Sequence, residues 1–161
     1  MATWNDVTTA APDVAELAKA RIEATGLALL ATLRRDGSPR ISGVEPGFFG
    51  AELWLGMMDG SLKAHDLQRD PRCALHNATV DKEVKEGDVK IAGRAIEVMS
   101  EDEKVDFLRQ FKEANGYAPE PGPMHLFKID VTEVSTIRPA GDHLDIDIWT
   151  EGGGLRHVDR Y

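Results

Sequence analysis

Short apolar runs separated by tight turns are the feature that most restricts what this chain can fold into. Leu27–Leu33 is an apolar run of strand length, and Asp36-Gly37 follows it as a hairpin turn signal. Pro39–Glu45 then has the pattern of a returning strand. A further turn, Pro46–Gly50, leads into a third strand at Glu52–Met57. Because strands joined by tight turns run in opposite directions, this half of the chain is predicted to form an antiparallel meander.

The second half of the chain adds more strands. Apolar or alternating patterns predict strands at Arg72–Val80, Val89–Met99 and His125–Arg138, and an edge hairpin beginning with Leu144–Trp149. Gly93 interrupts the second of these runs, which indicates a bulge or a close approach of another backbone. Six or more antiparallel strands favour a mainly β fold closed into a barrel. A Rossmann fold is excluded, since the strands do not alternate with helices and no G-x-G-x-x-G is present.

Three helices are expected, one before the first strand and two between later strands. Pro12–Thr25 has helical spacing of apolar residues, and Leu62–Arg69 is a short helix that Asp59 or Ser61 can cap. A capping-box pattern begins the third helix, Glu101–Ala114. The proline-containing segment that follows, residues 117–124, is expected to be a loop.

Length and charge limit the function classes. The 161 residues predict one domain, with a helix at about 12–25, a core barrel at about 27–138 and a hairpin or tail at about 139–161. The formal net charge of −9 argues against a nucleic-acid binder and against a polybasic membrane anchor. No secretory signal or apolar run of membrane-spanning length is visible, so a cytoplasmic location is expected. The single cysteine, Cys73, excludes an internal disulfide framework.

The segment with the clearest chemistry is Asp59–Leu67. A glycine turn there leads into a helix N-terminus, where free backbone N–H groups and the helix dipole favour an anion. Ser61 adds a hydroxyl donor. Lys63 adds a positive charge in the first turn, where a cation is unfavourable for the helix itself. These residues predict a phosphate-binding site, and the alternative interpretation is an ordinary N-cap beside a solvated lysine.

The same segment carries a family resemblance. Gly60-Ser61-Leu62-Lys63-Ala64 and the later Asp70-Pro71-Arg72 resemble the signature of the pyridoxamine 5′-phosphate oxidase-like family of FMN-binding split barrels. The turn and strand at residues 36–41 and the Gly93-Arg94-Ala95 strand also resemble that family. The resemblance covers residues 27–98, and residues 127–136 more loosely.

The resemblance implies a six-stranded antiparallel split barrel that forms a homodimer with a cofactor at the subunit interface. The family's usual cofactor is FMN, and one branch uses the deazaflavin coenzyme F-420. By this resemblance the cofactor-binding residues are Arg40, Ile41, Ser42, Val44, Met57, Met58, Ser61, Leu62 and Lys63. Ser61, Lys63 and Arg40 would contact the phosphate. Residues 41–44 would run beside the ring, and Met57 and Met58 would line the same cavity.

Two departures from the family pattern affect the choice of cofactor. Leu62 and Glu45 stand where FMN enzymes of the family often have Arg and Lys. Loss of two cations makes the deazaflavin, or an empty site, more credible. The implied function is a flavin- or deazaflavin-dependent oxidoreductase that transfers hydride to or from a small organic substrate. No catalytic acid or base is assigned. The alternatives are a non-catalytic flavin- or haem-binding module and a structural barrel with a vestigial site.

The remaining polar motifs favour structural roles. The histidines are scattered and no H-x-x-x-H pair exists, so no metal site is expected. His143, Asp145 and Asp147 alternate with apolar residues and so share one strand face. That face could bind a metal, but a solvated sheet face is the preferred interpretation. Cys73 is expected to be a buried, unreactive thiol.

Overall fold

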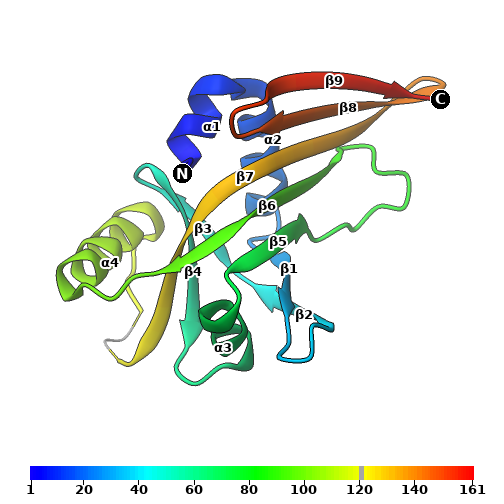
Figure 1. The fold of residues 1–161 in the computed structure, drawn as a ribbon. Helices are drawn as coiled ribbons and strands as arrows, with labels where there is room; N and C mark the ends of the chain where they lie inside the picture. Colours follow the sequence, from blue (N-terminus) through cyan, green and yellow to red (C-terminus); the bar gives the residue numbers. More distant parts are fainter. Residues whose placement is uncertain (120–121) are drawn as a thin grey trace.

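One antiparallel sheet organises the computed structural model, which describes residues 1–119 and 122–161. Its strands follow the order β2-β1-β5-β6-β7-β4-β3, and β8 and β9 continue outward from β7 (Figure 1). The strands are β1 Ala28–Leu33, β2 Pro39–Val44, β3 Pro46–Phe49, β4 Glu52–Met58, β5 Arg72–Asn77, β6 Asp88–Glu97, β7 Met124–Ala140, β8 His143–Thr150 and β9 Gly154–Arg160. The helices are α1 Trp4–Ala10, α2 Pro12–Glu23, α3 Leu62–Arg69 and α4 Glu101–Asn115. The predicted mainly β, antiparallel fold class is confirmed.

Several local predictions are confirmed. The hairpin turn at Asp36-Gly37 is closed by a bond from the Arg34 N–H to the Ser38 carbonyl, 2.8 Å long. Gly93 marks a bulge, because the register of β6 against β7 shifts between Ala92 and Gly93. Ser100 caps α4 by accepting the Glu103 N–H, and Gly116 ends the helix in the left-handed region. The predicted loop at residues 117–124 lies partly outside the described residues, and from Met124 the chain is in β7.

Three elements differ from prediction. Helix α1 was not expected, although Thr3 and Asp6 form a reciprocal capping box at its start. Pro46–Phe49 was expected to be part of a turn, but it forms strand β3, because pairing with β4 satisfies its backbone. No strand was predicted after Trp149, where a hairpin or tail was expected, but the segment forms a second hairpin strand, β9, whose first residue is the last of three consecutive glycines.

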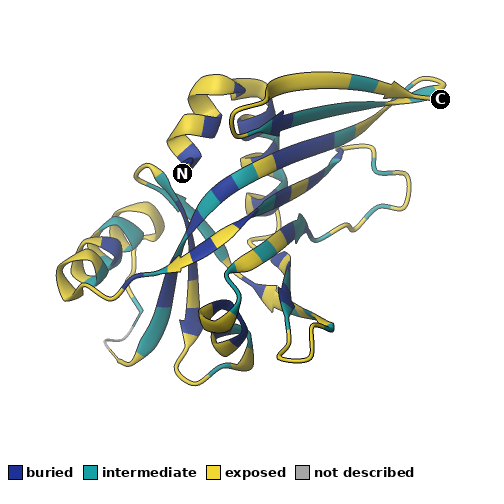
Figure 2. Ribbon diagram, viewed as in Figure 1, coloured by how far each residue is buried: buried dark blue, intermediate teal, exposed yellow. Residues whose placement is uncertain are grey.

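The main core lies between the sheet and helices α1 and α2. Figure 2 shows buried residues along the middle of β4, β6 and β7, whereas β9 is almost wholly exposed. A second cluster places Phe107 of α4 against Trp54 of β4 and Leu126 of β7. Among the described helices, none is both long enough and apolar enough to cross a membrane. Helix α3 lies at the lower end of the sheet, and its N-terminus is close to the end of β4 (Figure 1).

Candidate functional site

The N-terminus of α3 begins at a sharp turn after β4. Gly60 has a φ of +68°, a conformation that glycine adopts without a steric penalty. The Ser61 N–H bonds back to the Met58 carbonyl at 3.2 Å, and the Ser61 carbonyl accepts the N–H groups of Ala64 and His65. The turn therefore aims the first peptide groups of α3 outward from the end of the sheet.

Three donors at this N-terminus have no hydrogen-bond acceptor among the described residues. The N–H groups of Leu62 and Lys63 lie in the first turn, where the helix itself offers no acceptor. Ser61 occupies the N-cap position, but its hydroxyl makes no capping bond and is buried without a partner. Lys63 is half-buried and has no ion-pair partner in that described part of the chain. We call Ser61, Leu62 and Lys63 the cradle.

A buried carboxylate, Asp66, ties α3 to the sheet behind the cradle. Its side chain accepts hydrogen bonds from Arg40 Nε at 2.6 Å, Thr32 Oγ1 at 2.9 Å and Arg69 Nη2 at 2.9 Å. Burial raises the pKa of Asp66, but the bonds from the two arginines and Thr32 outweigh it and hold the pKa below its ordinary value. Asp66 is therefore ionised at neutral pH and fixes one edge of the Arg40 guanidinium.

Arg40 was expected to reach the cofactor phosphate, and its first partner in the structure is Asp66. Only Nε of its guanidinium is used in that contact. Its two terminal nitrogens have no acceptor within the described residues, and the side chain is 21% exposed. Arg40 thus retains donors that an anion beside α3 could use, while Asp66 holds the guanidinium in place.

A second supporting contact comes from β7. His125 Nδ1 lies 2.7 Å from a Glu97 oxygen, and the Gly60 N–H points to His125 Nε2 at 3.3 Å. In the tautomer that accepts the Gly60 N–H at Nε2, the ring proton lies on Nδ1 and is donated to Glu97. Burial raises the pKa of Glu97, but bonds from His125 and Gln68 outweigh it and lower the pKa. The sequence did not single out His125 or Glu97, since the contact joins residues far apart in the chain.

This contact predicts a measurable stability change. Replacing His125 with phenylalanine keeps a ring but leaves the Gly60 N–H and one side of Glu97 without partners. We expect the free energy of unfolding to fall by about 1–2 kcal/mol. Urea denaturation measures it. His65→Phe is the matched control, because the exposed His65 ring contacts the His125 ring at a centroid distance of 5.9 Å and bonds Gln68, but it bonds neither Gly60 nor Glu97. An equal loss in both variants would contradict the assignment.

The other predicted cofactor residues lie on two sides of the sheet. Ile41 is 71% exposed on the outer face of β2, while Ser42 is half-buried on the opposite face. Met58 is exposed beside the cradle, and the side chain of Leu62, within the cradle, is exposed as well. The predicted set also includes two residues whose side chains belong to the core, Val44 and Met57. For these two, only the backbone could face a ligand.

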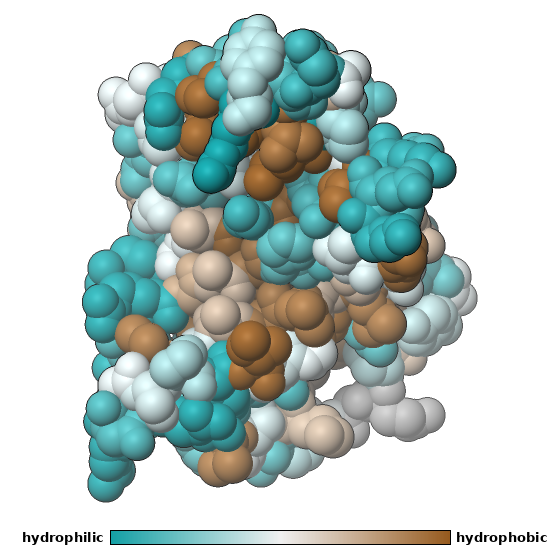
Figure 3. Space-filling view, turned by 90° about the vertical axis from the view of Figure 1, so that its right-hand side faces the viewer, coloured by the Kyte–Doolittle hydropathy of each residue, from teal (hydrophilic) through white to brown (hydrophobic). Residues whose placement is uncertain are grey.

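The outer face of the first strands is apolar and is built from small residues. Ile41, Ala31, Ala74 and Ala92 form one row across β2, β1, β5 and β6. Leu29, in the neighbouring row, is 46% exposed. Figure 3 views the side of the molecule on which β1 and β2 lie, and apolar patches are visible among the hydrophilic side chains. The outer face of the first strands thus includes an apolar area that is open to solvent.

The cysteine behaves as the sequence predicts. Cys73 Sγ points to the Gly93 carbonyl at 3.6 Å inside the sheet. Burial raises the pKa of the Cys73 thiol to about 12, so almost no thiolate exists at neutral pH. We assign it no chemistry.

Comparison with known proteins gives one family match and several structural likenesses. The profile of the family described as pyridoxamine 5′-phosphate oxidase matches residues 14–138. No curated protein matches the sequence significantly.

Three solved structures illustrate the likeness in fold. A pyridoxamine 5′-phosphate oxidase-related, FMN binding protein from Nostoc punctiforme PCC 73102 superposes with a TM-score of 0.65 at 14% identity, covering 94% of this chain and 96% of that chain. PhzG from Burkholderia lata 383, solved with tetrahydrophenazine-1-carboxylic acid, also gives 0.65 at 14% identity, covering 89% and 87%. A heme binding protein from Mycobacterium smegmatis gives 0.58 at 16% identity, covering 89% and 87%. Together they confirm the predicted split-barrel fold.

Proposed function

Because the chain belongs to the pyridoxamine 5′-phosphate oxidase family, we propose that the cradle binds the phosphate of a flavin-type cofactor. The cofactor is FMN or, alternatively, the deazaflavin coenzyme F-420. The protein is then an oxidoreductase acting on a small organic substrate. The observation that carries this proposal is the set of donors without acceptors at the α3 N-terminus.

The donor set suits a phosphate monoester. Two adjacent backbone N–H groups and a helix N-terminus provide directional donors and a favourable dipole. Lys63 adds a full charge, and Arg40, whose terminal nitrogens are not used by Asp66, adds a second cation. Rotation of Ser61 about its Cα–Cβ bond would turn the buried hydroxyl toward the same anion. Binding would thus provide partners for groups that the protein alone leaves unpaired.

The chain's part in the reaction is to hold and orient the cofactor. A bound flavin or deazaflavin supplies the hydride chemistry itself. Asp66 and His125 keep the phosphate-binding elements in place, and Ile41 offers an exposed apolar contact on β2. We assign no acid or base to the protein.

We also propose that the working unit is a homodimer. In the row through Ile41, Ala31, Ala74 and Ala92, Ile41 and Ala74 are exposed and the other two are half-buried in the single chain, and apolar faces of this kind often mark subunit contacts. A second chain on this face would cover Leu29 and Ile41 and enclose the nearby end of the cofactor site.

The charges near the cradle bear on which cofactor it accepts. Leu62 and Glu45, both exposed, bring no positive charge to the site, and Asp59 adds a negative one that is 66% exposed. A site with Lys63 and a partly neutralised Arg40 holds a phosphate less firmly than one with two further cations. From this charge balance we expect FMN to be weakly retained during purification.

Titration of the apo protein with each cofactor tests the proposal. We expect micromolar binding of FMN or F-420, followed by ligand fluorescence. Lys63→Ala should weaken it about 10- to 100-fold, because a charged hydrogen bond is worth roughly 1.5–3 kcal/mol. Lys19→Ala is the control, since it removes the same charge from helix α2. Binding of neither cofactor, or equal affinity in the two variants, would reject the phosphate site.

A second function, a non-catalytic binding module, is favoured by the same shortage of cations. In that case the protein would bind flavin or haem, but bound cofactor would show no turnover with a broad panel of acceptors. The absorption spectrum of the purified protein, with mass spectrometry of any co-purified ligand, separates the two functions.

A further inference from the structure

The C-terminal hairpin places imidazoles and carboxylates on one face. In β8, His143, Asp145 and Asp147 share a face because side chains alternate along a strand. In the paired strand β9, Asp159 lies directly opposite Asp145, and His157 lies opposite Asp147. The sequence indicated only the β8 half of this set. The register of β9 supplies the other half.

Three of these residues bring their donor atoms together. His143 Nε2 lies 3.1 Å from Asp145 Oδ1 and 3.7 Å from Asp159 Oδ1. All three donor atoms lie within 4.8 Å of one another. Ligand atoms on one tetrahedral Zn²⁺ are separated by about 3.3 Å, given metal–ligand bonds of roughly 2.0–2.2 Å. Small side-chain rotations therefore suffice to place all three on one ion.

The charges at this point favour a bound cation. Asp145 and Asp159 are like charges directly opposite in a cross-strand pair, an arrangement that destabilises a sheet. Arg138 of β7 lies opposite Asp145, but its guanidinium is closest to Asp147, at 3.7 Å. Of the described groups that contact Asp145 and Asp159, the ones able to carry positive charge are His143 and His157. A divalent ion would neutralise both carboxylates at once.

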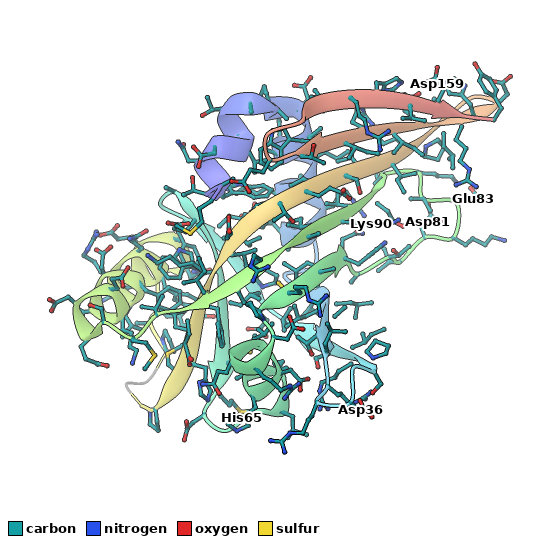
Figure 4. All side chains as sticks on the ribbon, in the orientation of Figure 1. Asp36, His65, Asp81, Glu83, Lys90 and Asp159 are labelled. Atoms are coloured by element: carbon teal, nitrogen blue, oxygen red, sulfur yellow. The ribbon has the colours of Figure 1, made fainter. Side chains whose placement is uncertain are left out.

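We propose that His143, Asp145 and Asp159 bind one divalent transition-metal ion of the Zn²⁺ class. An imidazole with two carboxylates is a nitrogen–oxygen donor set that suits Zn²⁺, Co²⁺, Ni²⁺ or Mn²⁺, whereas Ca²⁺ takes six to eight oxygen ligands. His157 Nε2 lies 2.8 Å from the same Asp159 oxygen, Oδ1, that faces His143, and it orients that carboxylate. This proposal is independent of the cofactor site: in Figure 4, Asp159 lies on the upper hairpin and His65 of α3 lies at the opposite end of the molecule.

The expected role of the ion is to hold the hairpin together. Strand β9 pairs only with β8 among the described strands, and its side chains are mostly exposed. An isolated two-stranded extension of this kind gains little stability from burial. An ion linking Asp159 of β9 to two residues of β8 would cross-link the strands near their free end.

Isothermal titration of tag-free protein with Zn²⁺ at about pH 8 tests this site. We expect one ion per chain. Asp159→Asn and His143→Gln should each lower the affinity at least about tenfold. Glu133→Gln is the matched control, because Glu133 is an exposed carboxylate of β7 opposite Thr150, outside the contacts of the three residues, and the affinity of this variant should stay within about threefold of wild type. Equal losses in all variants, or no difference between Zn²⁺ and Ca²⁺, would show diffuse attraction to an acidic surface and overturn the proposal.

Hydrogen exchange provides a second readout on the unaltered protein. Zn²⁺ should slow exchange of the amides in β8 and β9 and leave α3 unchanged. Unchanged exchange in the hairpin at saturating Zn²⁺ would place the ion elsewhere and also reject the site. Both measurements use protein without cofactor, so their outcome does not depend on whether the cradle binds a flavin.

Discussion

Replacing Asp66 with alanine is expected to lower the free energy of unfolding by about 3 kcal/mol. Asp66 is 3% exposed and accepts three hydrogen bonds, two of them from arginines. Its removal leaves Arg40 without its buried counter-charge. It also removes the side-chain hydrogen bonds that join α3 to Thr32 of β1 and to Arg40 of β2. Urea denaturation monitored by tryptophan fluorescence measures the loss.

Asp70→Ala is the matched control for this variant. Asp70 lies at the other end of α3 and binds Arg72, but that pair is on the surface, where ion pairs contribute little. Its removal should cost much less than the loss of Asp66. Equal losses of unfolding free energy in the two variants would show that the buried hydrogen bonds of Asp66 to the sheet contribute no more than a surface ion pair.

The Asp66 contribution should also depend on pH. Because its folded pKa is lowered, the stabilisation is fully present above the unfolded carboxyl pKa, near 3.9, and is lost as pH falls through the folded value. The difference in stability between wild type and Asp66→Asn should therefore be constant at neutral pH and narrow below about pH 4. A difference in stability between wild type and Asp66→Asn that widened in acid would contradict the direction of this pKa shift.

Gly93→Ala is expected to destabilise the protein by about 3 kcal/mol. A Cβ at this position would lie 2.5 Å from the Asp130 carbonyl oxygen and 2.7 Å from Ile129 Cγ2. The nearer atom belongs to the backbone of β7, so the clash cannot be relieved by a side-chain rotation. The bulge between β6 and β7 would have to shift, and thermal or urea unfolding would report the loss.

Gly43→Ala controls for the removal of a glycine from a strand. No atom lies within 4 Å of a Cβ built at Gly43. Its effect on the free energy of unfolding should stay within about 0.5 kcal/mol, the range of ordinary surface substitutions. If Gly93→Ala were as mild as Gly43→Ala, the close approach of β6 and β7 would not be a constraint on residue 93.

The sequence predicts features whose cause is local. Helix Leu62–Arg69 was predicted with the bounds that the structure has, because its glycine turn, its N-cap residue and the following Pro71 are all within a few residues. The turn at Asp36-Gly37 and the bulge at Gly93 were predicted for the same reason. The cradle belongs to this class, since its donors come from consecutive residues.

Contacts across the sheet could not be predicted in this way. Arg40 was assigned to the phosphate, and only the folded chain shows that Asp66 holds one edge of its guanidinium. His125 reaches Gly60 from a strand 65 residues further along. The face shared by His143 and Asp159 depends on the register of β8 against β9. Strand β9 was not predicted, because the run of three glycines leading into it has no strand pattern. Alternation along one strand gives half of such a face, and strand pairing gives the rest.

Folding of this sheet must join segments that are distant in the chain. Strand β1 pairs with β5 across the β2–α3 region, and β4 pairs with β7 across α3, β5, β6 and α4. Chains rich in such non-local pairings fold more slowly than helical bundles of similar size. Helix α3 connects β4 to β5, which these two ladders fix at separate places in the sheet. The place of the cradle in the sheet therefore depends on both ladders, and a chain without them would carry every proposed phosphate donor without the assembled site.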